Sequence, residues 1–381
     1  MKQIFKELRT QLRPFMMLLS LLLIWWTFSH VTEGAFLEPR NLSNLFRQMS
    51  LTGILASGMV LVIVLGQIDL SVGSMTAFLG GVLAVADQAG ASPAMSLLYS
   101  LMAGFALGSL QGTLTSYLRI PSFIVTLGGM MSLRGATMWL TSNSTIPIFS
   151  EGLLMWGNSS FSIGITKLFM SLVVVIFLLV SSATWWRARK KYPELYPISA
   201  FVFQTGVSAL ILAFAGWTFA SHEGLPYPVL LMGAVALVVH TFSQKTIWGR
   251  HIYAIGGNKE AAFLSGVPVK RRTIFVFVLT GLLSSIGGLV LSARVGSASP
   301  DAGQLLELDA IAACVIGGTS LMGGRGTIFG ALLGALIIES LNNGMSLANM
   351  EPYWQYLIKG LVLVIAVGID VNSRGKRGLL D

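Results

Sequence analysis

Charged residues are scarce in this chain. They make up 11% of its 381 residues, against about 25% in a typical soluble domain, and 54% of the residues are hydrophobic. Apolar runs of roughly 18 to 20 residues, the length that crosses about 30 Å of hydrocarbon, recur from residue 14 to residue 368. No stretch between them is long or polar enough to form a soluble domain. The composition therefore predicts an integral membrane protein with one domain, residues 1–381.

Motifs for ATP hydrolysis, covalent catalysis and metal binding are also absent. The sequence has no Gly-x-x-x-x-Gly-Lys-Ser/Thr loop and no nucleophile elbow. Cys314 is the single cysteine, which excludes an intramolecular disulfide and a multi-cysteine metal site, and the four histidines lack ligand spacing. Acidic residues do not recur along successive spans as in many proton-coupled transporters. We therefore expect a transport protein, not an enzyme, that binds no cofactor or metal and is driven by a separate partner that supplies the energy.

The apolar runs predict an all-α polytopic fold with about twelve transmembrane helices, within a range of about 10 to 12 because some are short. The expected spans are 14–32, 49–66, 71–88, 95–118, 121–141, 167–185, 198–219, 226–243, 273–294, 306–319, 326–344 and 353–370. Segment 306–319 is too short to cross the membrane without tilt. It is expected to be a broken or re-entrant helix, which is tolerated only where protein or a water-filled cavity surrounds it.

Basic residues gather in four clusters between the apolar runs, at residues 2–13, 187–191, 245–272 and 374–377. An even number of spans between the clusters places all four on one side, which the positive-inside rule identifies as the cytoplasm. Both termini are then cytoplasmic. The net charge of +9 is explained by clusters that face anionic lipid headgroups of the bilayer, so we expect no nucleic-acid partner.

The polar loop 244–272 contains the signals of a capped helix. Asn258 is a favourable N-cap, Glu260 suits the positive end of a helix dipole, and Gly266 followed by Pro268 is a typical stop. These signals predict about two turns, roughly 10 Å long, outside the membrane. Two interpretations are open: an ordinary loop helix, or a helix gripped by a soluble partner whose movement tilts the flanking spans.

Polar side chains in or beside the spans are candidates for a transport pathway: Asp69, Ser71, Ser122, Thr126, Glu307 and Asp309. A charge at the bilayer centre costs roughly 2.5 to 3.5 kcal/mol, so each acidic residue needs a reason. The structural alternative is capping, in which Asp69 accepts from the amides of Ser71 and Gly73, and Glu307 and Asp309 interact with the dipole of the short helix.

Three further charges, Arg134, Glu339 and Lys359, lie inside other spans. The same energetic argument applies to them, so each needs a reason. Arg134 and Glu339 are expected to pair with each other or to face water.

Two glycine-rich interruptions, 65–74 and 316–325, have similar sequences. Each follows an apolar run and combines glycine, small polar residues and leucine before the next span. They are candidates for corresponding points of two repeated halves near the transport pathway. Close helix packing through their glycines explains them equally well.

Five stretches resemble the monosaccharide permeases of bacterial ABC importers, the ribose/xylose permease family. They are 68–73 (IDLSVG), 121–128 (PSFIVTLG), 249–258 (GRHIYAIGGN), 260–262 (EAA) and 308–320 (LDAIAACVIGGTS). The resemblance covers almost the whole chain, but ribose, galactose and autoinducer-2 permeases share these blocks. The stretch 32–48 and an extra pair of spans at about 160–225, which ribose-type permeases lack, are more similar to the xylose permease.

The resemblance implies a permease subunit that moves a monosaccharide across the bacterial inner membrane, with D-xylose favoured over ribose or galactose. It implies a pair of permease copies, expected to be a homodimer, with a cytoplasmic ATP-binding subunit that uses the ATP and a periplasmic sugar-binding protein. A secondary sugar transporter that works alone on an ion gradient is the alternative.

The resemblance also favours one interpretation of the capped helix, because it matches this segment to the coupling helix that sits in a cleft of the ATPase. The implied interface is Arg250, Tyr253, Gly256, Gly257, Asn258, Lys259, Glu260, Ala261, Ala262, Ser265 and Gly266. Alanines would let the helix enter a tight groove, and Arg250 and Lys259 would meet acidic residues. In the implied cycle, ATP binding closes the ATPase pair, the helix moves with it, and the pathway alternates between outward and inward access.

Overall fold

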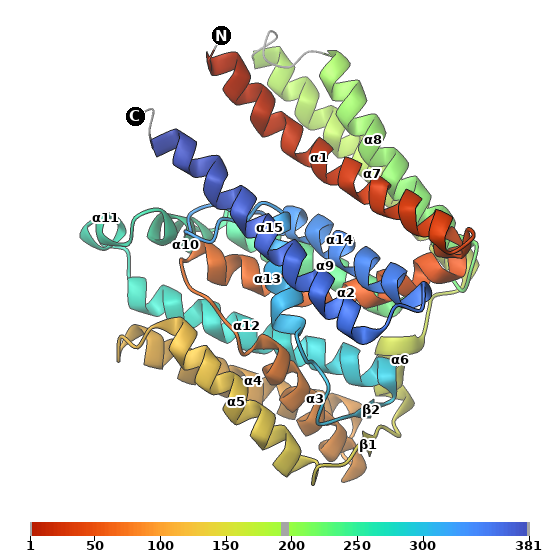
Figure 1. Ribbon diagram of the computed structural model, residues 1–381, viewed down its shortest axis with the longest axis vertical. Helices are drawn as coiled ribbons and strands as arrows, with labels where there is room; N and C mark the ends of the chain where they lie inside the picture. The colour runs from red at the N-terminus through yellow and green to blue at the C-terminus, as the bar shows by residue number, and fades with distance from the viewer. Residues whose placement is uncertain (1, 192–197, 379–381) are drawn as a thin grey trace.

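The computed structural model describes residues 2–191 and 198–378, which form a bundle of helices (Figure 1). Fifteen α-helices and a 3-10 helix, η1 (Ala35–Leu37), lie within these ranges. Two short strands, β1 (Ile146–Pro147) and β2 (Ser297–Ala298), pair antiparallel. The predicted all-α polytopic membrane fold is confirmed.

Each of the predicted spans coincides with a helix. These helices are α1 (Lys2–Val31), α2 (Pro39–Val64), α3 (Val72–Gln88), α4 (Pro93–Ser116), α5 (Ser122–Leu140), α7 (Ile163–Lys191), α8 (Ile198–Ala220), α9 (Tyr227–Lys245), α12 (Val269–Val295), α13 (Leu306–Ile316), α14 (Ile328–Leu347) and α15 (Pro352–Gly378). By length and composition, 7 of them can cross a membrane: α2, α4, α5, α7, α9, α12 and α14. Shorter apolar helices lie within α1, α3, α8 and α15.

Helix α13 is the short helix expected at 306–319. Its 11 residues cover roughly 16 Å at about 1.5 Å per residue, about half of the hydrocarbon thickness. Positive φ angles at Leu305 (63°) before it and Gly318 (97°) after it turn the chain sharply at both ends. Helices α2, α14 and α15 pack around it, as expected for a helix that does not cross the membrane alone.

Three short helices lie outside the predicted spans: α6 (Glu151–Asn158), α10 (Ile247–Gly257) and α11 (Lys259–Leu264). The sequence predicted a single helix in the 244–272 loop, so α10 was missed. It begins at a Thr246 N-cap, whose hydroxyl accepts a hydrogen bond from the Gly249 amide at 3.1 Å. Ile252 and Ile255 on one face of α10 are buried, which is the spacing of an amphipathic helix.

Helix α2 is the centre of the bundle. Every residue of 49–64 is buried, and α9, α12, α13 and α14 pack around this stretch (Figure 1). Apart from Ser50, Thr52 and Ser57 the stretch is apolar on all its faces, and such a helix is stable when neighbours cover every side.

Helices α4 and α12 pack backbone to backbone. Gly104, Gly108 and Gly112 recur every four residues along α4 and face α12. A Cβ on Gly112 would lie 2.7 Å from the Cα of Ile274, and one on Gly108 would lie 2.8 Å from the Cα of Val278. Small residues at this spacing allow the close helix approach on which van der Waals packing within membranes depends.

Helices α7 and α8 form a hairpin beside α1 at the edge of the bundle (Figure 1). This hairpin is the pair of spans predicted at about 160–225. Arg47 of α2 holds both of its ends, since Nη2 donates to Ser160 Oγ at 2.7 Å and pairs with Glu223 Oε2 at 2.9 Å. Trp25 of α1 contacts Phe214 of α8, with 5.9 Å between ring centroids.

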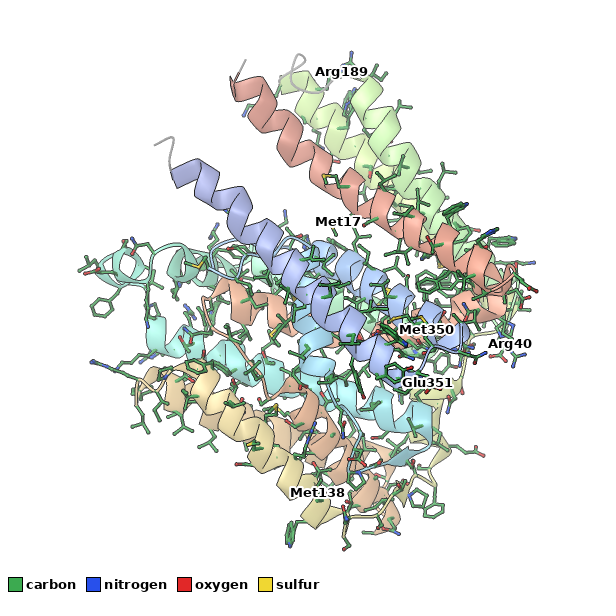
Figure 2. All side chains as sticks on the ribbon, in the orientation of Figure 1. Met17, Arg40, Met138, Arg189, Met350 and Glu351 are labelled. Carbon is green, nitrogen blue, oxygen red and sulfur yellow. The ribbon has the colours of Figure 1, made fainter. Side chains whose placement is uncertain are left out.

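The helix ends that carry the four basic clusters lie on one side of the bundle. In Figure 1 the start of α1, the end of α15 and helices α10 and α11 lie toward the top and left, and Figure 2 shows Arg189, near the end of α7, close to the start of α1. Arg40, Met350 and Glu351 lie at the opposite end (Figure 2). The arrangement agrees with the predicted common side for the clusters.

Candidate functional site

Helix α11 forms as the sequence predicted. Asn258 is its N-cap, and Oδ1 of this residue accepts a hydrogen bond from the Ala261 amide at 2.9 Å. Gly266 has a φ of 81°, and the amide of Val267 donates to the Ala262 carbonyl at 3.0 Å. This is the bonding of a Schellman C-cap. The helix is six residues long, slightly shorter than two turns.

The segment α10–α11 exposes most of the residues predicted to meet a partner. The exposed ones are Arg250, Gly257, Asn258, Lys259, Glu260, Ala261, Ser265 and Gly266. Ala262 is 6% exposed and packs inward, while Tyr253 and Gly256 are half-buried. These three residues therefore support the segment from within.

Tyr253 ties α10 to the connection 317–327. Its hydroxyl donates to the Gly326 carbonyl at 2.7 Å and accepts from Gln244 Nε2 at 3.2 Å. Burial raises the pKa of the Tyr253 hydroxyl, so the group remains protonated and able to donate at neutral pH. Tyr253 thus belongs to the inner face of α10.

Sequence reasoning missed two exposed apolar residues at the end of α11. Phe263 is 67% exposed and Leu264 is 78% exposed. Large apolar side chains displayed on a polar loop are typical of a protein interface. Their position directly after the alanines of the capped helix is the sequence feature that could have indicated them as interface residues.

Gly256 brings α10 against the end of α2 and against the interruption 316–325. A Cβ on Gly256 would overlap the Val64 carbonyl oxygen and lie 2.6 Å from the Gly324 amide nitrogen. That amide donates to the Val64 carbonyl at 2.8 Å. Val64 ends α2, immediately before the interruption 65–74, and Gly324, with a φ of 71°, lies in the interruption 316–325. The end of α2 and the interruption 316–325 therefore meet at a junction that α10 covers.

Arg272 joins α10 to the first turn of α12. Its guanidinium lies 3.5 Å from the centroid of the Trp248 ring, and its Nε donates to His251 Nδ1 at 3.2 Å. Both partners belong to α10. The cation-π contact and the hydrogen bond thus link the two helices directly.

Four predicted pathway residues lie close together at the start of α3, in two hydrogen-bonded pairs. Asp69 Oδ1 accepts from the Ser71 amide and hydroxyl at 2.8 and 2.7 Å. Ser122 Oγ accepts from the Ile68 amide at 3.1 Å, and Thr126 Oγ1 donates to the Ser122 carbonyl at 2.9 Å. All four predicted residues are buried. The capping interaction predicted for Asp69 is therefore present at the Ser71 amide.

The other two predicted pathway residues, Glu307 and Asp309, are buried in different surroundings. Glu307 packs against Gly73, where a Cβ would overlap its carboxylate. In the described part of the chain, Glu307 Oε2 and Asp69 Oδ2 are buried without a hydrogen-bond partner. The first turn of α3 therefore faces two carboxylates that can still accept a hydrogen bond.

Asp309 belongs to a buried polar network that joins α2, α13, α14 and α15. Lys359 Nζ lies 3.0 Å from Asp309 Oδ2, and Glu339 accepts a hydrogen bond from the Thr52 hydroxyl. The predicted pairing of Glu339 with Arg134 is wrong, because within residues 2–191 and 198–378 no ion pair joins them. Thr52 supplies the partner instead.

Asn258→Ala is expected to loosen α11 without unfolding the bundle. Loss of an N-cap costs about 1 kcal/mol, which corresponds to roughly fivefold faster hydrogen exchange at the Ala261 amide. Asn258→Asp keeps the accepting oxygen and should exchange like the unmodified chain. Exchange measured by mass spectrometry that is equally accelerated in both variants would contradict the cap as the cause.

Comparison with known proteins gives one family. A family model described as the permease component of branched-chain amino acid transport systems matches residues 41–367. The xylose transport system permease protein of Haemophilus influenzae is 41% identical over 374 residues, 98% of this chain and 100% of the relative. The protein of that name in Escherichia coli K12 is 43% identical over 369 residues, 95% of this chain and 93% of the relative. The ribose import permease protein of Bacillus subtilis is 34% identical over 368 residues, 96% and 94% of the two chains. No solved structure matches.

Proposed function

Because the chain belongs to the permease family of the branched-chain amino acid transport type, and is the multi-pass membrane subunit of a bacterial ABC sugar importer, we propose that it transports D-xylose. The observation that carries this proposal is the identity of 41% and 43% with two xylose permeases over nearly the whole chain, against 34% with a ribose permease. Ribose and galactose are the competing sugars.

The proposed assembly is a homodimer of this chain with a cytoplasmic ATPase and a periplasmic sugar-binding protein. An ABC permease depends on a separate ATPase, so the ATP is bound and used there. We propose twelve spans with both termini in the cytoplasm. The common side of the basic helix ends supports this orientation.

Helix α11 is the proposed contact with the ATPase. Ala261 is small and exposed, which would let the helix enter a groove, and Phe263 and Leu264 would lose their exposure to water there. The basic side chains of Arg250 and Lys259 are exposed beside them and suit an acidic groove rim.

A movement of α11 would be transmitted through α10 to the helices of the bundle. Only Asn258 separates α11 from α10. From α10, the close backbone contact at Gly256 leads to α2, and the Arg272 contacts lead to α12. We propose that this route converts closure of the ATPase pair into the change of access.

The buried group at the start of α3 is the proposed transport pathway. Hydrogen bonds with Ser122 and Thr126 hold residue 68 against α5, and the Asp69–Ser71 bond fixes the adjoining turn, in the conformation described. When this contact opens, Asp69 and Glu307 each offer an oxygen that can accept from a sugar hydroxyl. Ser122 and Thr126 would then expose their hydroxyls to the same space.

Reconstitution in liposomes tests both the sugar and the mechanism. The chain is combined with the candidate ATPase and binding protein, and ATP-dependent uptake of labelled xylose, ribose and galactose is compared. Xylose uptake that needs all three components is the expected result. Uptake of another sugar alone would correct the substrate, whereas uptake by this chain without the ATPase, sensitive to an ion gradient, would replace the importer by a secondary transporter.

Ala261→Trp is expected to abolish ATP-dependent uptake, because the indole cannot enter a groove that fits an alanine. The variant should still reach the membrane in normal amount. Ala183→Trp, at an exposed alanine of α7, is the matched control and should transport normally. Normal uptake by Ala261→Trp would remove α11 from the interface.

A further inference from the structure

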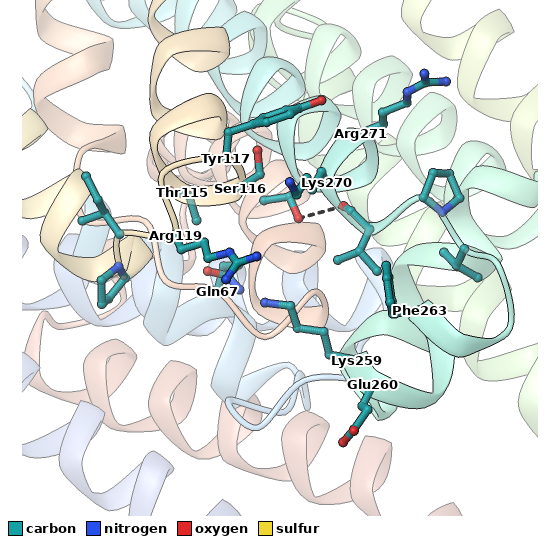
Figure 3. A pocket seen from close by; sticks show the side chains of 16 residues that line it. Gln67, Thr115, Ser116, Tyr117, Arg119, Lys259, Glu260, Phe263, Lys270 and Arg271 are labelled. Atoms are coloured by element: carbon teal, nitrogen blue, oxygen red, sulfur yellow. Dashed lines mark hydrogen bonds between the residues drawn. The ribbon is translucent and has the colours of Figure 1, made fainter.

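A cavity of about 840 Å³ lies beside α11, between the connection from α4 to α5 and the start of α12 (Figure 3). It opens on the side of the bundle where α10 and α11 lie. Its volume falls within the roughly 300 to 1,000 Å³ typical of small-molecule sites.

Four basic side chains line this cavity: Arg119, Lys259, Lys270 and Arg271. Within residues 2–191 and 198–378 none of them has a carboxylate within ion-pair distance. Glu260 is the one acidic residue of the lining, and Figure 3 shows its carboxylate directed away from the cavity. The cavity lining is therefore strongly positive and has no paired carboxylate among the described residues, although Lys270 Nζ lies 4.7 Å from the centroid of the Tyr117 ring.

Two hydroxyl groups on the α4 side of the cavity lack partners. Thr115 Oγ1 and Ser116 Oγ are buried, and the described part of the chain supplies no hydrogen bond to either. Helical Ser and Thr hydroxyls often bond to a carbonyl of the preceding turn, which these two do not. A buried hydroxyl without a partner costs about 1 to 3 kcal/mol, so a small rotation of either side chain toward the cavity would let it donate to a ligand and recover this cost.

We propose that this cavity binds the phosphate group of an anionic ligand. Guanidinium groups and hydroxyls donate in the geometry that phosphate oxygens accept, and lysines add positive charge. The group can belong to the headgroup of an anionic lipid or to a soluble phosphorylated metabolite, since the cavity faces the proposed cytoplasmic surface of the membrane.

Such a ligand would bridge Lys259 of α11 and Arg119 of the α4–α5 connection. It would thereby restrain α11 against the start of α5, where Ser122 holds residue 68. This regulatory consequence rests on the proposed role of α11, and Lys259 is shared with the proposed ATPase contact. The binding site itself also rests on Arg119, Lys270 and Arg271, which lie outside that contact.

Thermal unfolding of the purified full-length chain in detergent tests the binding. Inorganic phosphate is titrated against chloride at equal ionic strength, and phosphatidylglycerol is titrated against phosphatidylcholine. At least one anionic probe should raise Tm while its matched control does not. In Arg119→Gln/Lys270→Gln the midpoint of this rise should move at least about tenfold higher, because two charge-assisted donors are lost.

Two further variants separate the cavity from general surface charge. Arg187→Gln/Lys245→Gln removes two exposed basic residues outside the cavity and should keep the original midpoint. Thr115→Val/Ser116→Ala changes no charge and should weaken binding severalfold, which also tests the site if the arginine variant does not fold.

The pattern of response identifies the ligand source. A response to phosphatidylglycerol alone supports a lipid headgroup, and a response to phosphate supports a soluble ligand. The proposal is overturned if neither probe acts, or if the control variant loses the response equally. It is also overturned if the cavity variants lose only affinity for the ATPase, which would make the cavity a protein docking surface.

Discussion

Gly256→Val is expected to destabilise the purified chain by at least about 3 kcal/mol, at the upper end of overpacking effects. The valine Cβ would occupy the place of the Val64 carbonyl oxygen, and the Gly324 amide lies 2.6 Å away. Both obstacles are backbone atoms, so no side-chain rotation can relieve the clash. The junction of α2, α10 and the connection 317–327 must therefore open.

The neighbouring glycine provides a matched control. A Cβ on Gly257 meets nothing within 4 Å, and the residue lies in the last turn of α10. Gly257→Ala should therefore leave stability unchanged or raise it by up to about 1 kcal/mol through helix propensity. Unfolding by SDS in mixed micelles measures both variants. Equal stability of the two would refute the tight contact at Gly256.

Lys359→Met is expected to destabilise the chain by about 2 to 3 kcal/mol. The substitution leaves the carboxylate of Asp309, whose side chain is 9% exposed, without its cation at 3.0 Å. Removing one partner of a buried ion pair costs about 3 to 5 kcal/mol, and the 24% exposure of Lys359 lowers the expected value.

A double-mutant cycle isolates the pair. Lys359→Met/Asp309→Asn removes both charges and should recover most of the stability lost by Lys359→Met, because no unpaired charge remains. Lys359→Arg keeps the charge and should lose less. Additive effects in the cycle, measured by the same unfolding assay, would show that the two residues do not interact.

Local signals in the sequence were sufficient to predict helix α11 and its two ends. Its N-cap, its C-terminal glycine and the proline beyond it lie within eleven residues, 258–268, and each acts on adjacent backbone groups. The apolar spans were predicted for a similar reason, since length and hydropathy decide them. Helix α10 was missed because its apolar face is short and its cap, Thr246, directly follows the basic end of α9.

Contacts between distant segments could not be predicted in the same way. Asp309 and Lys359 are separated by 50 residues. The local sequence around either residue gives no indication that the other is its partner. Arg134 and Glu339 were expected to pair or to face water only because both were intramembrane charges. Glu339 is buried and does neither, since a neutral hydroxyl from Thr52 donates to it instead. Likewise, the sequence showed Gly256 as one glycine of a loop, while its need to be glycine comes from α2 and Gly324.

The row of glycines between α4 and α12 has a mechanical consequence. Two helices that touch through backbone atoms have no long side chains between them that can change rotamer, so we expect them to move together as one rigid unit. Arg272 attaches α10 to the N-terminal end of α12 in this helix pair. A push at that end would therefore rotate both helices together, and a small displacement there would become a larger one at the far ends of α4 and α12.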